Sequence, residues 1–239
     1  FSGSHMATYN YLRDKITRAT AGSGLKVENI FVSGRHNLSA RQCYNALGID
    51  KGDPLLQVRA SRIKQNLESL NWIEKASVRI RYPDTVYIDI KEYQPLALWH
   101  NGTTIVLIGL DGTVITDTRL DRFIDLPVLT GKKANLEARS LLTLVEAENA
   151  LKKRFKAAAY IGERRWDIQL KSGVIIHLPQ DNAPLALARL ARAHDRQGVL
   201  DKDVISLDLR HSDRLIIKTK PGAVQTLREK QTVSNSGRI

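Results

Sequence analysis

The side chains that most often carry out chemistry are few and scattered in this sequence. A general base, a nucleophile or a metal ligand needs partners close by, so such residues should gather in recognisable motifs. The motifs of hydrolases, nucleotide-binding loops and zinc proteases are all missing. The single cysteine, Cys43, cannot build a structural zinc site, and we expect it to pack in the core on the apolar side of a helix. The histidines occur singly, without metal-ligand spacing: His36, His100, His177, His194 and His211. The sequence therefore predicts no catalytic residue, no metal ion and no cofactor.

Two short motifs invite a chemical interpretation, and each also has a plainer one. Asp111-Gly112 could begin a calcium loop, but the other acidic positions of such a loop are missing, so a hairpin turn is favoured. Arg164 and Arg165 precede Trp166, and this pair could bind a phosphate group or stack on a ring. A charged rim beside a buried tryptophan is the simpler interpretation. Neither motif indicates an enzyme, which leaves recognition of another molecule as the expected activity.

The net charge of +12 raises the question of an anionic partner. Lys and Arg are spread along the chain, and no basic stripe is interleaved with aromatic residues of the kind that stack on bases. Binding to nucleic acid is therefore not expected. Anionic lipid headgroups fit better, because Arg13, Lys15 and Arg18 lie together near the start.

A compact α+β unit is predicted for residues 25–93. A strand over 27–34 is followed by a helix over 39–47, for which Ser39 can serve as the N-cap, and by a second helix over 58–70. Alternating apolar residues then predict a hairpin, with strands over 78–82 and 86–90. Both helices are expected on one face of a three-stranded sheet.

A second, larger unit is predicted for residues 94–220, beginning at the hinge Gln94-Pro95. Short strands, a helix over 136–155, a clear hairpin over 166–178 and a helix over 184–197 follow one another. The last regular element comprises residues 204–210 and 214–218, which form either a final hairpin or one long strand with a bulge.

The two ends are expected to lie outside these units. Residues 1–6 resemble a remnant of an expression tag. Residues 7–24 are either a tether before the first unit or a disordered terminus, and residues 221–239 are expected to be a disordered tail. The sequence holds no run of eighteen or more apolar residues.

The order of residues in the first unit resembles a known domain. The stretches that carry the resemblance are Ile30-x-Val32-x-Gly34, Gly52-x-Pro54-Leu55, Asn71-Trp72-Ile73, Tyr82-Pro83-Asp84 and Glu92-x-Gln94-Pro95. They are similar to the POTRA domain of the FtsQ (DivIB) family of bacterial cell-division proteins. In the second unit Trp99, Leu107 and the run Asp208-Leu209-Arg210 also resemble that family, so the resemblance covers residues 25–218.

The resemblance implies a fold and a location. The fold is α+β: a small POTRA domain, then a larger extended antiparallel sheet with two helices packed on one face. It also implies a non-enzymatic scaffold at the division septum, with this region in the periplasm. A transmembrane helix before Ala7, absent from this sequence, would anchor the protein in the inner membrane.

A partner-binding site is expected at the last strand. A chain-terminal strand often has one neighbour, and its free amides and carbonyls can pair with a strand of another chain. The charges of Arg210, Arg214 and Lys218 could instead protect this edge from pairing. The resemblance implies that the edge binds FtsB, which pairs with FtsL as a coiled coil, while the POTRA domain recruits the protein to other division proteins. The residues that it implicates are Arg210, His211, Ser212, Asp213, Arg214, Leu215 and Ile216, with Arg164 or Arg165 as a clamp for an acidic group.

POTRA domains also occur in the periplasmic machinery that assembles or secretes outer-membrane proteins, which is the alternative function. There they usually form tandem arrays, whereas this sequence shows one such unit and no repeat.

Overall fold

The computed structural model describes residues 25–116 and 118–220, and the chain divides after Tyr93 into two compact units. The predicted tag remnant, tether and C-terminal tail lie outside the described residues.

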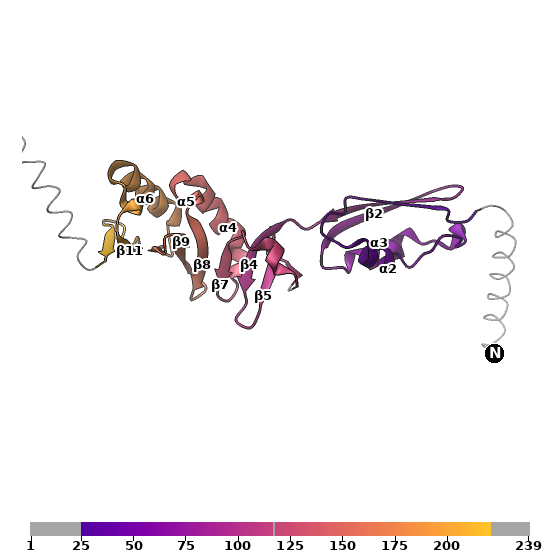
Figure 1. The fold of residues 1–239 in the computed structure, drawn as a ribbon, viewed down its shortest axis with the longest axis horizontal. Helices are drawn as coiled ribbons and strands as arrows, with labels where there is room; N and C mark the ends of the chain where they lie inside the picture. Colours follow the sequence, from indigo (N-terminus) through magenta and orange to yellow (C-terminus); the bar gives the residue numbers. More distant parts are fainter. Residues whose placement is uncertain (1–24, 117, 221–239) are drawn as a thin grey trace, which may run out of the picture. The chain divides into compact units, whose positions relative to one another are not determined.

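The first unit is a three-stranded sheet with two helices along one face (Figure 1). The sheet order is β1-β3-β2, with β1 parallel to β3 and β2 antiparallel to β3. The core between the sheet and the helices contains Cys43, Ile63 and Ile88. This arrangement agrees with the α+β unit expected from the sequence. Its elements are β1 (Asn29–Ser33), α2 (Ala40–Leu47), the 3-10 helix η1 (Leu55–Gln57), α3 (Ala60–Glu68), β2 (Ile73–Arg81) and β3 (Thr85–Glu92).

Local signals explain where α2 begins and ends. Ser39 has extended backbone angles, and its hydroxyl accepts a hydrogen bond from the amide of Gln42 at 3.2 Å, as predicted. Gly48, at φ 63°, ends the helix in the left-handed region that glycine adopts readily. The second predicted helix, over residues 58–70, is shorter than expected, because Val58 and Arg59 have extended backbone angles and α3 covers only Ala60–Glu68.

A buried carboxylate holds the connection between β1 and α2. Glu92, at the end of β3, is 8% exposed and accepts hydrogen bonds from the amides of His36, Asn37 and Leu38 at 2.8, 2.7 and 3.0 Å. Burial raises the pKa of this carboxyl, but the three backbone hydrogen bonds outweigh burial and lower the pKa below its ordinary value. Glu92 therefore fixes the loop through its charged form.

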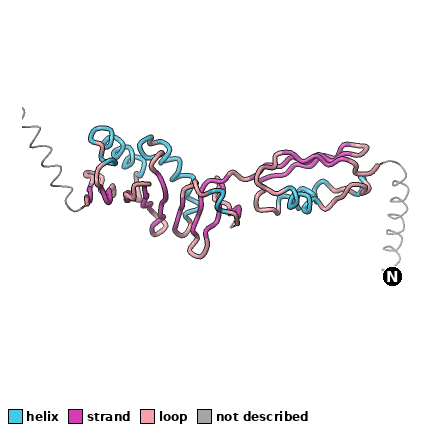
Figure 2. The backbone as a smooth tube through the Cα atoms, viewed as in Figure 1, coloured by secondary structure: helices cyan, strands magenta, loops and turns pink. Residues whose placement is uncertain are grey.

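The second unit is built on one large sheet whose helices lie on one side, as the cyan and magenta segments of Figure 2 show. Among the described residues nine strands form this sheet, in the order β12-β11-β10-β9-β8-β7-β4-β5-β6. The covered face is apolar and includes Leu129, Ile168 and Leu207, which pack with Leu141 of α4 and Leu187 of α6. The strands are β4 (Pro95–His100), β5 (Ile105–Gly109), β6 (Val114–Thr116), β7 (Val128–Thr130), β8 (Phe155–Ile161), β9 (Arg165–Leu170), β10 (Ile175–His177), β11 (Val204–Asp208) and β12 (Ile216–Thr219). The helices are η2 (Leu120–Phe123), α4 (Ala134–Ala147), α5 (Asn149–Lys152), α6 (Ala183–Gln197) and η3 (Val199–Asp201).

This larger sheet is mixed rather than purely antiparallel, which corrects the expectation from the sequence. Three neighbouring pairs are parallel: β4 with β7, β7 with β8, and β10 with β11. The physical reason lies in the connections. The chain crosses a helix between β7 and β8 and again between β10 and β11, and such a crossover returns the chain to the end of the sheet from which it started.

The helix predicted over residues 136–155 is also divided. Glu148 has extended backbone angles, so α4 ends at Ala147, a single turn of α5 follows, and Phe155 already belongs to β8. β8 is thus a strand that helical spacing concealed, and it joins β7 to β9 in the middle of the sheet.

Candidate partner-binding edge

β12 lies at one edge of the large sheet. Within the described residues its strand neighbour is β11, to which it is antiparallel with Asp208 opposite Ile216 and Leu207 opposite Ile217. The two strands therefore form a final hairpin, which decides between the alternatives left open by the sequence. The other side of β12 faces none of the described strands.

The hydrogen-bonding alternation along β12 indicates which backbone groups point away from β11. The amide of Lys220, directly after β12, donates to the carbonyl of Asp203 at 3.1 Å. Because hydrogen-bonding direction alternates along an antiparallel strand, the amides of Lys218 and Ile216 also face β11. The extra residue in this pairing lies on β11, between Val204 and Ser206, and leaves the alternation along β12 intact. The outward amides are therefore those of Ile217 and Thr219.

Two adjacent isoleucines on this edge are exposed. Ile216 is 44% exposed and Ile217 is 41% exposed. Since successive side chains of a strand point to opposite faces, each face of the sheet carries an apolar side chain at its border. A partner strand paired with β12 could cover both.

Most residues predicted at the site lie just before β12, in the loop over residues 209–215, rather than in the strand. Arg210 pairs with Asp208, and their closest atoms are 2.6 Å apart. Arg189 of α6 donates to the carbonyl of His211 at 2.8 Å and to that of Ser212. The loop is thus held against α6 through its backbone. Of the remaining predicted residues, Asp213 and Arg214 form an exposed pair 3.9 Å apart, Leu215 packs against the core, and Ile216 alone lies in β12.

The two arginines proposed as a clamp differ in their surroundings. Arg164 is exposed in the turn between β8 and β9. Arg165 is half-buried at the start of β9 and pairs with Asp167 at 3.1 Å. Trp166 is buried, and its ring lies 4.7 Å from that of Tyr160, so these arginines border a buried tryptophan as the simpler interpretation expected.

The sheet register brings both groups of predicted residues to one end of the sheet. His177 of β10 lies opposite both Asp167 of β9 and Asp208 of β11. The start of β9, the end of β11 and the start of β12 therefore share that end. Three strand spacings separate β9 from β12, or about 14 Å.

A row of ionisable side chains runs across this end of the sheet. His177 Nδ1 lies 3.0 Å from Asp167, which also pairs with Arg165. The next carboxylate in the row is Asp208. Its hydrogen bonds with the Arg210 side chain lower its pKa to about 2 although burial opposes this, so Asp208 stays ionised at neutral pH. The row ends in a cation at either side, Arg165 and Arg210, and the end nearer β12 is Arg210.

Sequence reasoning missed several of these residues. Nothing in the spacing of Arg189 along its helix indicates a hydrogen bond to a loop 22 residues later. Asp167 and His177 become neighbours only through the register of β9 and β10. Ile217 and Thr219 were missed because period-two spacing identifies the buried face of a strand, whereas β12 is exposed on both faces.

In the described ranges, 25–116 and 118–220, no three His, Cys, Asp or Glu side chains come together as metal ligands would. Cys43 is buried in the core of the first unit, as predicted, and burial raises its pKa. Over the same ranges no helix is both long and apolar enough to cross a membrane.

Two family models match the chain in succession. One is described as "POTRA domain, FtsQ-type" and matches residues 25–93. The other is described as "Cell division protein FtsQ/DivIB, C-terminal" and matches residues 97–210, so β12 lies beyond its end.

Relatives named cell division protein FtsQ match most of the chain. The protein of Agrobacterium fabrum is 34% identical over 206 residues, which cover 86% of this chain and 65% of that protein. The protein of Bradyrhizobium diazoefficiens is 30% identical, covering 95% of this chain and 67% of the relative. That of Rhizobium radiobacter is 33% identical over 77% of this chain and 88% of the relative. The chain thus spans slightly less than two thirds of the length of the Agrobacterium relative.

An FtsQ-type POTRA domain joined to an FtsQ/DivIB C-terminal domain defines a class of bacterial cell-division proteins. Together with these relatives, the two matches show that this chain belongs to the FtsQ family of cell division proteins.

Proposed function

We propose that this protein is a non-enzymatic scaffold of the division machinery that binds FtsB, in its complex with FtsL, at the free edge of β12. In this proposal a strand of FtsB pairs with β12, and the POTRA domain recruits the scaffold to other division proteins. An anchor in the inner membrane holds the described region in the periplasm, at the septum. The observation that carries the proposal is the edge position of β12, with the amides of Ile217 and Thr219 directed away from β11.

The side chains at this edge favour a receptive strand over a protected one. Natural edge strands avoid pairing through charges, proline, bulges or a covering element. β12 carries one charge, Lys218, which follows the two exposed isoleucines Ile216 and Ile217, and Arg210 is already paired with Asp208. Burial of two isoleucines would add apolar contact to the backbone hydrogen bonds.

The charge of the region favours an acidic partner segment. Arg210, Arg214 and Lys220 at the ends of β12 are each paired with an aspartate, so the excess positive charge comes from Lys218 in β12 and from Arg164 at the same end of the sheet, both of which are exposed. Complementary charge mainly speeds association and selects the partner, whereas the strand pairing supplies the lasting contact.

Amide hydrogen exchange of the full chain, measured by NMR with and without the FtsB–FtsL complex, tests this function. Pairing at the edge should slow exchange of the Ile217 and Thr219 amides by tenfold or more, while the amides of Ile216 and Lys218, already directed at β11, change less. Binding that leaves Ile217 and Thr219 unprotected would place the partner elsewhere, and absence of binding would exclude FtsB–FtsL as the partner.

A further inference from the structure

A groove in the POTRA domain lies between the end of α2, η1 and the first turns of α3. Its volume is about 640 Å³, which is within the range of sites that bind ligands or side chains. The apolar part of its lining contains Leu47 and Ile63, both buried in the domain core, with Ile49 and Val58 partly exposed above them. The groove is therefore open to solvent, with a mainly polar lining in which Ile49 and Val58 leave a smaller apolar patch exposed.

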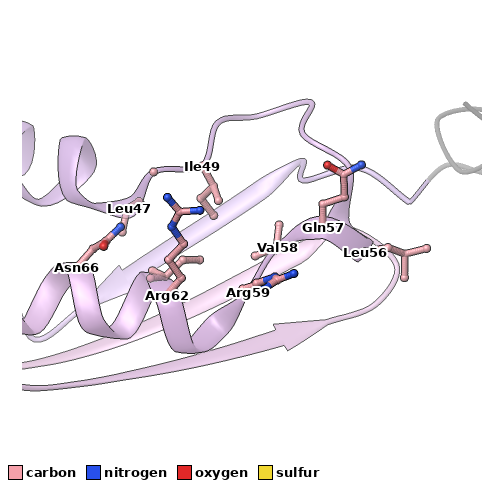
Figure 3. A pocket seen from close by; sticks show the side chains of 10 residues that line it. Leu47, Ile49, Leu56, Gln57, Val58, Arg59, Arg62 and Asn66 are labelled. Atoms are coloured by element: carbon pink, nitrogen blue, oxygen red, sulfur yellow. The ribbon is translucent and has the colours of Figure 1, made fainter. Parts of the chain in front are cut away.

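Two arginines line this groove. Arg59 precedes α3 and Arg62 lies in its first turn, and both are exposed. Figure 3 shows Arg62 rising from α3 towards the loop that carries Ile49, and Leu56 pointing away from the helix. Leu56 is 49% exposed, so an apolar side chain also stands at the far end of the groove.

Some cations of this domain are paired with acidic groups, whereas among the described residues these two arginines are not. Arg79, for example, pairs with Asp89 at 3.0 Å, and Lys91 pairs with Glu74 at 2.7 Å. In the described part of the chain neither Arg59 nor Arg62 has an acidic partner, and no acidic residue lines the groove. The groove thus presents two unpaired positive charges beside exposed apolar surface.

We infer that this groove binds an acidic amphipathic helix of another division protein, which deepens the proposed function by giving the chemistry of POTRA recruitment and rests on that function. Arg59 and Arg62 are three residues apart, and carboxylates three or four residues apart on a partner helix have the matching spacing. The apolar face of the same helix would lie on Ile49 and Val58, as amphipathic helices lie in apolar grooves.

The number of cations argues against an anionic membrane as the occupant. Recognition of anionic lipids usually involves clusters of about four to eight Lys or Arg side chains. The groove has two such side chains, Arg59 and Arg62. Its apolar residues Ile49 and Val58 are only partly exposed, so they are not placed to enter a bilayer. An acidic amphipathic peptide could contact both the two arginines and the apolar patch of Ile49 and Val58.

The first test measures binding of designed peptides to the full chain by NMR. The probe is a helical peptide of about sixteen residues with leucines at i, i+3, i+4 and i+7, two glutamates spaced three or four residues apart beside them, and alanine and glutamine elsewhere. A second peptide has lysines in place of the glutamates, and phosphatidylglycerol vesicles are the third probe. The glutamate peptide should bind and shift the amide signals of Gly48, Ile49 and residues 60–63. The Arg59→Glu/Arg62→Glu variant should bind it about tenfold or more weakly, since two attractions become repulsions.

The matched control is Lys75→Glu/Arg81→Glu, which makes the same change in net charge on two exposed residues of β2 outside the groove lining. This variant should bind the glutamate peptide as the unchanged protein does. The inference would be overturned if the glutamate and lysine peptides bound equally well, or if the signals that shift lay outside the groove. It would also be overturned if the control variant lost as much affinity for the glutamate peptide, or if the protein bound the vesicles but not that peptide.

The second test separates this inference from the proposed function. The same two variants are placed in the full-length protein, fused to a fluorescent protein, in its own bacterium. Septal localisation of the unchanged fusion and of the control, with loss in Arg59→Glu/Arg62→Glu, supports the groove. If all three fusions localise, the groove is not the recruiting site but the scaffold function stands, and if the unchanged fusion does not localise, the proposed function itself fails.

Discussion

Arg210 and Asp208 form a two-pronged ion pair at the end of β11. Nε of Arg210 lies 2.9 and 3.1 Å from the two carboxylate oxygens of Asp208, and Nη2 lies 2.6 Å from Oδ2. The amide of Arg210 also donates to Asp208 at 3.0 Å, so the pair fixes the first residues of the loop that leads to β12. Arg210 therefore shapes this loop, and in the proposed complex its remaining donors would face the partner.

Arg210→Glu should weaken binding of FtsB–FtsL by about 1–3 kcal/mol, or roughly 5- to 150-fold. The new carboxylate would lie beside Asp208 and would repel an acidic partner. Isothermal titration calorimetry measures the change. Arg139→Glu, with the same charge change on an exposed residue of α4, serves as the control and should bind normally. An unchanged affinity for Arg210→Glu would remove this arginine from the interface.

Ile217→Pro should abolish most partner binding while the hairpin stays formed. Proline removes the outward amide and places its ring where a partner strand would lie, and proline is tolerated on the free side of an edge strand. Ile216→Pro is the informative companion, because it removes an amide that faces β11 and should disturb the hairpin itself. Partner titrations followed by NMR, with the signals of β11 as the structural control, distinguish the two. Full binding by Ile217→Pro would contradict strand pairing at β12.

Glu92→Gln should destabilise the POTRA domain by about 1.5–3 kcal/mol, because three backbone amides lose a charged acceptor. The rate at which a thiol reagent modifies Cys43 reports opening of this domain alone, since Cys43 is the only cysteine and lies in its core. Glu74→Gln, which breaks an exposed ion pair with Lys91, should cost less than about 1 kcal/mol. Similar labelling rates in the two variants would show that the loop does not depend on Glu92.

The same carboxylate predicts the behaviour of the POTRA domain in acid. The pKa of Glu92 is lower in the folded domain than its ordinary value of 4.5, so its contribution is fully present above that value. The contribution is lost as the pH falls from 4.5 through the lower pKa of the folded state. The labelling rate of Cys43, divided at each pH by the rate in the unfolded chain to remove the pH dependence of the thiolate, should therefore rise more steeply on acidification in the unchanged protein than in Glu92→Gln. Parallel pH profiles would assign the acid sensitivity to other groups.

Gly34→Ala should destabilise the POTRA domain by about 3 kcal/mol or more. Gly34 has φ 78°, and a Cβ there would overlap the carbonyl oxygen of Ile90 in β3. Gly52→Ala separates the cost of the positive φ from the cost of the steric overlap. Gly52 also has a positive φ, 95°, but an added Cβ there meets nothing within 4 Å. The cost at Gly52 should be about 1–2 kcal/mol, and equal costs at both positions in urea unfolding would argue against the close approach of β3.

Local signals predicted the smaller domain more completely than the larger one. Ser39 and Gly48 mark the ends of α2 through their own backbone and hydroxyl preferences, which a sequence displays directly. In the larger domain Ala157, Ala158 and Ala159 belong to β8 although alanine favours helices, because pairing with β7 and β9 overrides local preference. The parallel pairs were missed for a related reason, since turn motifs report only strands that follow each other directly.

At the candidate partner-binding edge, too, local signals predicted some features, whereas contacts between residues distant in the sequence set the others. Alternation over residues 204–210 predicted the last regular element, as either a hairpin or one bulged strand, and the resemblance to the FtsQ family implicated Arg210. The roles of Arg189 and of the row from Arg165 to Arg210 depend on side chains brought together by the sheet register. No spacing along the chain encodes those contacts.

From β8 to β12 each strand lies directly beside the one that precedes it along the chain. A strand of another chain bound at β12 would take the position that the next strand of this chain would occupy. Binding would therefore add a strand to the sheet in the same order in which β8 to β12 follow one another. No existing strand has to move aside, and the ordering of the incoming segment becomes the main entropic barrier to association.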